Sequence, residues 1–454
     1  MASSGFLDLL QCPRCRRAPL VPSGERLACR GCRVDYPRLG GLPWLFAEPE
    51  LALGEWRNRL TLYLEEFAAA ERAAQADLAS ATRDLTRARV ARLRDAYREQ
   101  AALVRGLLEP LALASLPLPH ATPLAFGDRL PLSQDLHSYY ANVHRDWCWG
   151  GEENAASHAE VAAALGGGAQ RVLVLGAGGG RLAYDLHQHG AQALTVALDI
   201  NPLLLLVAER VVRGGRVELY EFPIAPLSGT DVALRRELAA PAAARPGLEL
   251  VFADAWRAPF AAQSFDAIVT PWLIDIVDVD FESIALAVNR LLVPGGRWVN
   301  FGSLAFPWRR PSLRYGPEEL RELLAEAGFE VGLQRDAALP YMRSPASRHA
   351  RIETVALFAA DKRRRGPREP AEAWTPPWLR DTALPVPRSD ALALAADASR
   401  IQAVLLALVD GQRSIDELAG IVAEQGLLPA AQAGSAVRGL LERLHRAAER
   451  NDHA

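Results

Sequence analysis

Residues 171–181 read RVLVLGAGGGR, an apolar run that leads directly into a glycine-rich turn. An apolar run of this length, bounded by glycine, is typical of a buried β-strand. A glycine turn after the first strand of a doubly wound sheet lets the main chain approach a ligand where the next helix begins. The stretch therefore predicts an α/β fold with a ligand site at its first strand-helix junction.

Four further apolar segments follow this strand and alternate with stretches of helical periodicity. They are ALTVALDI at 193–200, LELVFAD at 248–254, FDAIVTPW at 265–272 and RWVNFG at 297–302. Strands that alternate with helices predict a parallel sheet with helices on both of its faces. We therefore expect a doubly wound, Rossmann-like sheet in a domain that spans residues 135–361.

Two aspartates follow strands of this expected sheet. Asp199 ends the second strand, where an acidic residue can accept hydrogen bonds from two ribose hydroxyls. Asp254 follows the third strand and is placed to meet an adenine amine, while LLVPGGRW at 291–298 is a turn and strand familiar from class I methyltransferases. A dinucleotide site shares the glycine turn and the acidic residue, but Arg181 stands where such a site has its third small residue. Together and in this order, the glycine turn, the two aspartates and the LLVPGGRW segment favour S-adenosylmethionine over NAD. Taken singly, a glycine could serve only a turn and Asp199 could be only a helix cap.

A narrower resemblance covers roughly residues 139–360. VLVLGAGGGRLAYDL at 172–186 and FDAIVTPWLIDIVDVDFESIALAVNRLLVPGGRWVNFGSLAF at 265–306 resemble the carnosine N-methyltransferase family. That family has a GAGxGRLA loop, an FFIDTA-type segment and the pattern LKPGG-x-W-x-N-x-GPL, and Asp146 and Trp147 match its DW pair ahead of the glycine loop. The resemblance implies a class I methyltransferase that uses S-adenosylmethionine.

The resemblance also implies roles for residues of the methyl-donor site. Arg181 would pair with the methionine carboxylate, Asp199 would bind the ribose and Asp254 would lie beside the adenine. The donor-binding residues that we expect are Gly176, Ala177, Gly178, Gly180, Arg181, Asp199, Ile200, Asp254, Ala255 and Thr270.

The acceptor side matches the family less completely. Asp275 matches the aspartate of the IDTA segment, which contacts the substrate imidazole in that family, and we expect it to be the catalytic residue. The expected walls of the acceptor pocket are Trp272, Trp308 and Tyr341. The family's histidine falls at Pro307, and its tyrosine-rich segment is replaced by SRHARIETVALF at 347–358, which argues against carnosine as the acceptor. In the alternative interpretation, Asp275 only caps the helix after the fourth strand.

The N-terminal region carries four cysteines in two close pairs. Cys12, Cys15, Cys29 and Cys32 form the pattern C-x2-C-x13-C-x2-C, which is typical of one tetrahedral Zn²⁺. Four thiolates leave no open coordination position, so we expect a structural site. The flanking sequence, FLDLLQCPRCRRAPL at 6–20 and LACRGCRVDYPRLGGLPWL at 27–45, resembles Trm112-like zinc ribbons, which in their family support or activate methyltransferases. We expect this ribbon to occupy residues 1–48.

The rest of the chain divides into three segments. We expect a helical segment and strap at 49–134, a proline-rich linker at 362–389 and a helical domain at 390–454. The C-terminal domain contains LLALVDGQRSIDELAGIVAEQ at 405–425, which resembles PqqD-like winged-helix modules that grip leader peptides. A plain helical docking or dimerisation domain is an equal alternative. Either way, the domain suggests a peptide or protein partner.

The composition excludes several other classes of partner. Half of the 454 residues are hydrophobic, whereas the formal net charge is only −3. This balance predicts a folded protein without the basic excess that nucleic acids or anionic membranes attract. The sequence lacks a signal peptide pattern and a long apolar run, so we expect a cytoplasmic location.

The expected reaction is methyl transfer to a nitrogen. The acceptor would be an imidazole or amine of a small molecule, or a histidine-like side chain in a peptide. Two alternatives stay open: a non-catalytic scaffold built on a methyltransferase fold and, disfavoured by the glycine pattern, an NAD-dependent oxidoreductase.

Overall fold

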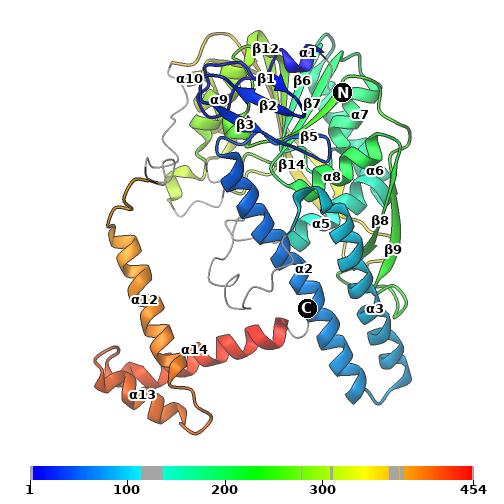
Figure 1. Cartoon of the computed structure of the whole chain (residues 1–454). Helices are drawn as coiled ribbons and strands as arrows, with labels where there is room; N and C mark the ends of the chain where they lie inside the picture. The colour runs from blue at the N-terminus through cyan, green and yellow to red at the C-terminus, as the bar shows by residue number, and fades with distance from the viewer. Residues whose placement is uncertain are drawn as a thin grey trace.

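The structure is a computed structural model that describes residues 4–113, 136–277, 279–306, 310–367, 378 and 383–451. Residues 114–134 of the expected helical segment and strap, and half of the expected proline-rich linker, lie outside these residues. None of the described helices combines the length and apolar character that crossing a membrane requires. Figure 1 shows a sheet covered by helices, with a long helical pair and a C-terminal group of helices beside it.

A seven-stranded sheet forms the centre of the molecule, in the order β10-β7-β6-β11-β12-β14-β13. Its strands are β6 (Arg171–Leu175), β7 (Leu194–Asp199), β10 (Leu248–Phe252), β11 (Phe265–Pro271), β12 (Leu292–Gly302), β13 (Phe329–Tyr341) and β14 (Arg351–Lys362). The five strands from β10 to β12 pair in parallel, whereas β14 runs antiparallel to both of its neighbours. Each of the five strands expected from the sequence is present, which confirms the doubly wound α/β fold.

Helices cover both faces of this sheet. One face packs against α6 (Gly151–Leu165), α7 (Arg181–His189) and α8 (Pro202–Val212), and the other packs against α9 (Phe281–Leu291) and α10 (Pro317–Glu326). The residues of β6 alternate between the two apolar cores: Val172 and Val174 belong to the first, Leu173 and Leu175 to the second. Because both faces of β6 are buried, the strand reads as a continuous apolar run.

The topology creates a crevice next to β6. This strand leads along the chain to β7, on one side of it, whereas β11, on its other side, leads away to β12. Ligands of doubly wound sheets bind at the carboxyl ends of the strands beside such a switch point. The crevice therefore lies where Leu175 passes into the glycine loop and Pro271 passes into Trp272.

Two antiparallel hairpins were not expected from the sequence. β8 (Arg216–Glu221) pairs with β9 (Leu234–Ala239) between α8 and β10, and β13 pairs with β14 at the end of the sheet. The burial of β8 alternates along the strand, because one of its faces is exposed. An isolated bridge from Pro226 to Ser347 joins the loop of the first hairpin to that of the second.

Two long helices precede the sheet domain. α2 (Pro49–Ser80) and α3 (Asp84–Leu107) form an antiparallel pair, which Figure 1 shows extending past the sheet. Tyr63 of α2 stacks on Tyr140 of α5 (Leu136–His144), with ring centroids 4.8 Å apart. The pair is thereby anchored to the first described helix of the sheet domain.

The N-terminal module is built from short strands. It comprises α1 (Ser4–Leu7), β1 (Val21–Ser23), β2 (Arg26–Cys29), β3 (Val34–Tyr36), β4 (Arg38–Leu39) and β5 (Leu42–Pro43). The main chain of Leu45 donates a hydrogen bond to the carbonyl of Phe252 at 2.8 Å, and Trp44 forms a parallel bridge with the same residue. The module therefore covers β10, which would otherwise be an exposed edge strand of the sheet.

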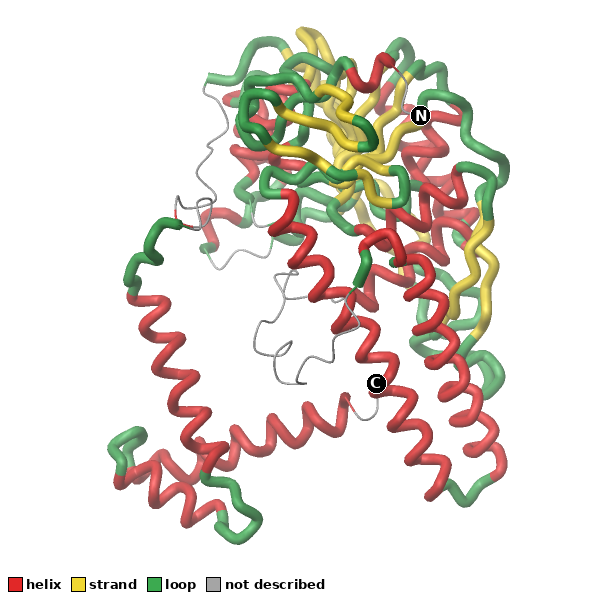
Figure 2. Tube along the Cα trace, in the orientation of Figure 1, coloured by secondary structure: helices red, strands yellow, loops and turns green. Residues whose placement is uncertain are grey.

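The C-terminal domain is helical, as expected. α12 (Asp390–Ala407), α13 (Ile415–Glu424) and α14 (Ala430–Asn451) enclose a small core of their own. Its buried members are Leu405, Leu418, Ala419, Val422, Ala433 and Val437. Figure 2 shows helices and loops in this part of the chain, and residues 383–451 contain no strand. The resemblance to a winged-helix module stays a prediction.

Lys362 is the one lysine of the chain, and it ends β14 in a buried position. Its Nζ donates hydrogen bonds to the carbonyls of Asn289 and Leu292, each at 2.7 Å. These carbonyls lie at the carboxyl end of α9, where a cation is favoured by the helix dipole. The ammonium group therefore caps the helix from the sheet.

Replacing Lys362 with methionine is expected to lower the free energy of unfolding by about 2 kcal/mol, because the two buried carbonyls lose their donor. Chemical denaturation of the full chain would measure the change. The matched control is Arg310→Met, at an exposed position, which should leave stability nearly unchanged. Equal stability of the two variants would contradict the capping role.

Candidate functional site

The glycine loop after β6 has a conformation that requires glycine. Gly176, Gly178 and Gly180 all have positive φ angles, of 70°, 57° and 82°. A Cβ on Gly176 would lie 2.8 Å from a methyl carbon of Leu273, whereas a Cβ on Gly178 would meet nothing within 4 Å. The loop therefore packs tightly on one side and leaves open space above Gly178, as a ligand cradle requires.

Asp199 holds this loop from the end of β7. Its Oδ2 accepts a hydrogen bond from the main-chain N–H of Gly178 at 2.7 Å, and its Oδ1 accepts one from Asn201 at 2.8 Å. Burial raises the pKa of Asp199 to about 6, although these main-chain donors act to lower it. The adjacent Ile200 keeps 43% of its surface exposed. A carboxylate and an exposed apolar side chain thus stand together beside the cradle.

Asp254 lies in the turn after β10. It is the N-cap of a short 3-10 helix, Ala255–Arg257, and its Oδ1 accepts a hydrogen bond from the main chain of Trp256 at 2.9 Å. Burial raises the pKa of Asp254, while the main-chain bond and the charges of Arg257 and Arg16 oppose this shift. The strands β10 and β7 are neighbours in register, so Asp254 and Asp199 follow adjacent carboxyl ends of the sheet.

Arg181 begins α7 directly after the glycine loop. Its Nε donates to Asp185 at 2.8 Å, and its Nη1 donates to the carbonyl of Asp146 at 2.8 Å. The guanidinium also lies over the ring of Trp147, which itself donates to the carbonyl of Gly179. Two of its donors are thus engaged by the protein, and its pairing with a methionine carboxylate stays a prediction.

The structure adds Arg145, which sequence reasoning missed. Its guanidinium bonds Oδ1 of Asp146, and its Nη1 lies 3.4 Å from Glu153. The other oxygen of Asp146 lies directly against Gly179, while Glu153 accepts a hydrogen bond from the main chain of Met342 at 2.8 Å. Arg145 therefore sits between the glycine loop and the end of β13. The match of Asp146 and Trp147 to a family motif, extended by one residue, would have found it.

The expected acceptor residues gather after β11. The rings of Trp272 and Tyr341 lie 5.0 Å apart, and the guanidinium of Arg351 lies 4.6 Å from the centre of the Tyr341 ring. Trp272 has a φ angle of 50°, and a Cβ on Gly302 would lie 2.8 Å from its Cα. A left-handed tryptophan is a strained conformation that costs energy, and such residues cluster at functional sites.

Asp275 is buried a short distance beyond Trp272. Its Oδ2 accepts a hydrogen bond from the main chain of Ala305 at 3.2 Å, whereas its Oδ1 has no partner among the residues that the structure describes. Burial raises the pKa of Asp275. The N-cap of α9 is Asp280, which accepts the hydrogen bond from Ser283. Asp275 therefore does not cap α9, so the alternative interpretation of this residue was wrong.

Tyr139 connects the two groups of residues. Burial raises the pKa of its phenol, and the charges of Asp199 and Asp275 act in the same direction, together with the phenol of Tyr341. A side chain that is influenced by both carboxylates lies in the neighbourhood that they share. Asp199 and Asp275 therefore both lie near Tyr139, at the carboxyl edge of the sheet.

The side chain of Thr270, one of the expected donor-binding residues, lies inside the sheet. The hydroxyl of Thr270 donates to Asn300 and accepts a hydrogen bond from Trp298, both at 2.9 Å, and the residue has no exposed surface. The hydroxyl of Thr270 is engaged by these two residues inside the sheet. A contact with the methyl donor therefore stays a prediction for the main chain of Thr270 alone. Trp308 and Pro307 lie outside the described residues.

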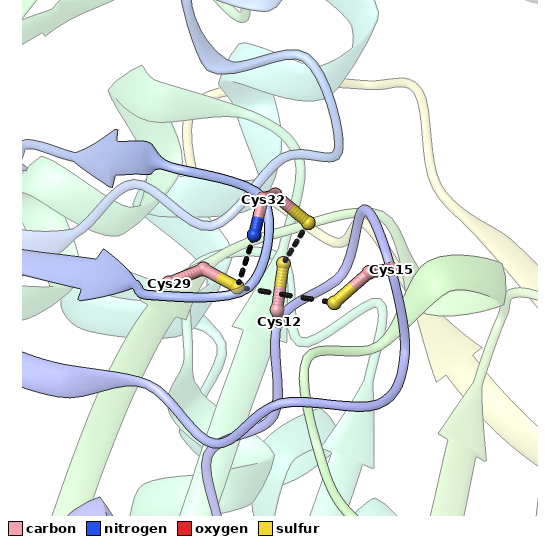
Figure 3. Close-up of side chains that lie close together, drawn as sticks. All are labelled: Cys12, Cys15, Cys29 and Cys32. Atoms are coloured by element: carbon pink, nitrogen blue, oxygen red, sulfur yellow. Dashed lines mark hydrogen bonds between the residues drawn. The ribbon is translucent and has the colours of Figure 1, made fainter.

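The four cysteines converge from the two knuckles of the N-terminal module (Figure 3). Their Sγ atoms all lie within 4.8 Å of one another, with Cys12 and Cys32 separated by 3.8 Å and Cys15 and Cys29 by 3.8 Å. Sulfurs about 2.3 Å from a tetrahedral Zn²⁺ would be about 3.8 Å apart, whereas a disulfide needs about 2.05 Å. The main chain of Cys32 also donates to the sulfur of Cys29 at 3.3 Å. The geometry and the donor set fit one Zn²⁺.

Replacing Cys29 with serine is expected to lower the metal content from about one zinc per chain to well under one, because a structural site needs all four thiolates. Elemental analysis of the purified full chain measures the content directly. Cys148→Ser is the matched control, since this cysteine is exposed and outside the cluster, and it should retain the zinc. An unmodified chain that holds no zinc would overturn the assignment.

Comparison with known proteins adds sequence relatives to this geometry. Residues 134–363, half of the chain, match the model of a family described as carnosine N-methyltransferase. A stretch of 108 residues is 37% identical to a 2-phytyl-1,4-naphtoquinone methyltransferase of Thermosynechococcus vestitus and amounts to 24% of this chain. The match covers only 44% of that protein's length. A stretch of 53 residues, 12% of this chain, is 38% identical to UPF0434 protein MS0934 of Mannheimia succiniciproducens and covers 87% of it.

A solved structure shows a more distant likeness. The N-methyltransferase NodS of Bradyrhizobium japonicum WM9, in complex with S-adenosyl-L-homocysteine, shares 15% identity with this chain. The match covers 50% of this chain and 99% of NodS, with a TM-score of 0.32. The fold assignment depends on the strand order and the parallel pairing of the sheet.

Proposed function

The chain belongs to the carnosine N-methyltransferase family, and we propose that it is an S-adenosylmethionine-dependent N-methyltransferase. The acceptor that we propose is an imidazole or amine nitrogen, in a small molecule or in a histidine-like side chain of a peptide. The observation that carries this proposal is the buried Oδ1 of Asp275, which has no hydrogen-bond partner among the described residues and belongs to a residue that follows the strained Trp272.

The donor half of the proposal depends on the glycine loop and its flanking carboxylates. Asp199 would bind the ribose hydroxyls, Ile200 would cover the adenine ring and Asp254 would accept a hydrogen bond from the adenine amine. Asp146, which lies against the loop, bonds two cations: Arg145 donates to its carboxylate and Arg181 donates to its main-chain carbonyl. Either arginine could balance the methionine carboxylate. When bound, S-adenosylmethionine supplies a methyl group whose S–C bond is already activated by the sulfonium charge.

The acceptor half depends on Asp275 and the aromatic pair. Oδ2 of Asp275 is fixed by the main chain of Ala305, which leaves Oδ1 to orient an N–H of the acceptor. Trp272 and Tyr341 present aromatic rings, which suit a flat heterocycle or a cationic amine. The residues at 347–358 differ from the family pattern, so we propose an acceptor other than carnosine itself.

The protein's chemical task is to hold a nitrogen lone pair in line with the methyl carbon and to manage one proton. As the N–C bond forms, the S–C bond breaks and the acceptor loses one proton, from the attacking nitrogen of an amine or from the other ring nitrogen of an imidazole. Asp275 would accept this proton or stabilise the positive charge until water removes it. Burial raises the pKa of its carboxyl, which makes it a better proton acceptor than an exposed aspartate.

Calorimetry distinguishes this proposal from an NAD-dependent oxidoreductase. The zinc-loaded full chain is expected to bind S-adenosylhomocysteine and to show no measurable affinity for NAD, because Arg181 replaces a small residue of the dinucleotide pattern. Binding of NAD without S-adenosylhomocysteine would overturn the proposal.

A transfer assay distinguishes an enzyme from a scaffold. Labelled S-adenosylmethionine is offered with a panel of histidine-containing small molecules, peptides and simple amines. Incorporation of label into a nitrogen of one class identifies the acceptor. A chain that binds the donor but labels no member of the panel, alone or with cell extract, would favour the scaffold alternative.

A further inference from the structure

The first knuckle of the cysteine cluster contacts the turn that carries Asp254. Arg16 directly follows Cys15, and its Nη2 donates a hydrogen bond to the carbonyl of Trp256 at 3.0 Å. Trp256 is the middle residue of the 3-10 helix whose N-cap is Asp254. The contact joins residues 240 positions apart in the chain.

Main-chain bonds hold the ribbon on both sides of this turn. Before it, Leu45 donates to the carbonyl of Phe252 at 2.8 Å. After it, Gln11 donates to the carbonyl of Pro259 at 2.8 Å, and Ala261 donates to the carbonyl of Leu9 at 3.0 Å. The ribbon is therefore fixed against the chain that enters and leaves the Asp254 turn, and Arg16 reaches the turn itself.

The two knuckles offer an internal comparison. Arg16 has a φ angle of 52° and donates its N–H to the carbonyl of Cys12 at 2.9 Å. Arg33, which follows Cys32, has a φ angle of 58° and donates its N–H to the carbonyl of Cys29 at 2.9 Å. Glycine adopts this left-handed conformation without strain. A glycine at either position therefore suits the knuckle while it removes the guanidinium.

The charge of Arg16 also acts on Asp254. Burial of Asp254 raises its pKa, and the positive charges of Arg257 and Arg16 oppose this effect. An ionised carboxylate is a stronger hydrogen-bond acceptor than a neutral carboxyl group. Arg16 thus contributes both to the position of the turn and to the charge of its aspartate.

We propose that Arg16 is a positioning residue of the methyl-donor site, which holds the Ala255–Arg257 turn so that Asp254 faces the adenine amine. The inference rests on the proposed donor role of Asp254. It also makes the folded zinc knuckle a condition of full donor affinity, because the knuckle determines where the Arg16 side chain begins.

Calorimetry with S-adenosylhomocysteine on the zinc-loaded full chain tests this role. Arg16→Gly is expected to raise the Kd about tenfold, since a charge-assisted hydrogen bond to the donor-binding turn is lost. Arg33→Gly, the matched control, makes the same change of main-chain preference in the other knuckle and should leave the Kd unchanged. Zinc content is measured in both variants and should equal that of the unmodified chain.

A second ligand separates positioning from general destabilisation. S-inosylhomocysteine carries an oxygen in place of the adenine amine, so it makes no hydrogen bond to a carboxylate at that position. The preference for S-adenosylhomocysteine over this analogue should fall in Arg16→Gly and persist in Arg33→Gly. Arg16→Met is a second variant, which removes the guanidinium but keeps a long side chain and the same main-chain strain. It should show the same loss of preference as Arg16→Gly, including the case in which the glycine variant loses zinc.

The outcomes distinguish failure of the proposed role of Arg16 from failure of the proposed function. If the unmodified chain binds S-adenosylhomocysteine and both variants at position 16 bind it as tightly as Arg33→Gly, the role of Arg16 is overturned while the donor site stands. If the unmodified, zinc-loaded chain does not bind this ligand, the proposed function fails and the inference fails with it.

Discussion

Replacing Asp275 with asparagine is expected to lower kcat by about 100- to 1,000-fold, the range of a lost general base. The amide has the shape of the carboxyl group, and its oxygen can still accept the hydrogen bond from Ala305. It cannot take a proton, however, and its NH₂ group would oppose an acceptor N–H. Donor affinity should stay within about twofold, because Asp275 lies outside the glycine loop.

The dependence of kcat on pH provides a second signature of Asp275. Burial raises its pKa above the ordinary value of about 3.9. The ionised carboxylate is the form that accepts a proton, so kcat should fall as the pH falls through this raised pKa. The Asp275→Asn variant should lose this acid limb.

Asp280→Asn is the matched control for this experiment. Asp280 is five positions further along the chain and caps α9, and asparagine is an equally good N-cap. The control removes one nearby carboxylate and should leave kcat nearly unchanged. If both variants turn over as fast as the unmodified chain, Asp275 has no catalytic role.

Replacing Asp199 with asparagine is expected to raise the Kd for S-adenosylhomocysteine by about 100-fold or more, which corresponds to about 2.7 kcal/mol. One carboxylate oxygen becomes an NH₂ group, which would oppose the main-chain N–H of Gly178 or of Asn201. The variant therefore loses a ribose acceptor and loosens the glycine loop at the same time. Calorimetry on the full chain measures the loss.

The control for Asp199 lies at the opposite end of the same sheet. Asp266 also accepts two main-chain hydrogen bonds, from Gln170 at 3.0 Å and from Arg171 at 2.8 Å. In Asp266→Asn the remaining oxygen can still accept both hydrogen bonds, so this loss of a half-buried carboxylate charge at the sheet edge should leave donor affinity unchanged. A similar rise in Kd for both variants would show that general destabilisation causes the effect.

Donor affinity should also depend on pH through Asp199. Burial raises the pKa of this residue to about 6. A protonated carboxyl group is a weaker acceptor for ribose hydroxyls, so affinity should fall as the pH falls from about 7 to about 5. In Asp199→Asn the affinity should be weak and nearly independent of pH across this window.

Local patterns in the sequence predicted most of the sheet. The apolar run from Val172 to Leu175 is buried on both faces, and the glycines at 176, 178 and 180 have the positive φ angles that favour glycine. The strand hairpins were not predicted, because strands such as β8 are half exposed and carry charges along their length. Short-range patterns therefore succeeded where burial is complete and failed where it is partial.

The candidate site was predicted in part for the same reason. Asp199 and Asp254 follow strands directly, so the strand pattern places them at the carboxyl edge of the sheet. Arg145 could not be found this way, because it reaches the glycine loop through Asp146 from a helix that precedes the sheet. The inward hydroxyl of Thr270 is likewise set by Trp298 and Asn300 on the neighbouring strand.

The sequence by itself determined the apolar strands of the sheet, the glycine loop and the two close pairs of cysteines, because each depends on residues close together in the chain. The tertiary structure alone decided that the N-terminal module covers β10 and that Arg16 reaches the Asp254 turn. These features depend on pairing between distant segments and on the direction of single side chains. Such contacts form only when the sheet, its helices and the ribbon pack together, and no local pattern encodes them.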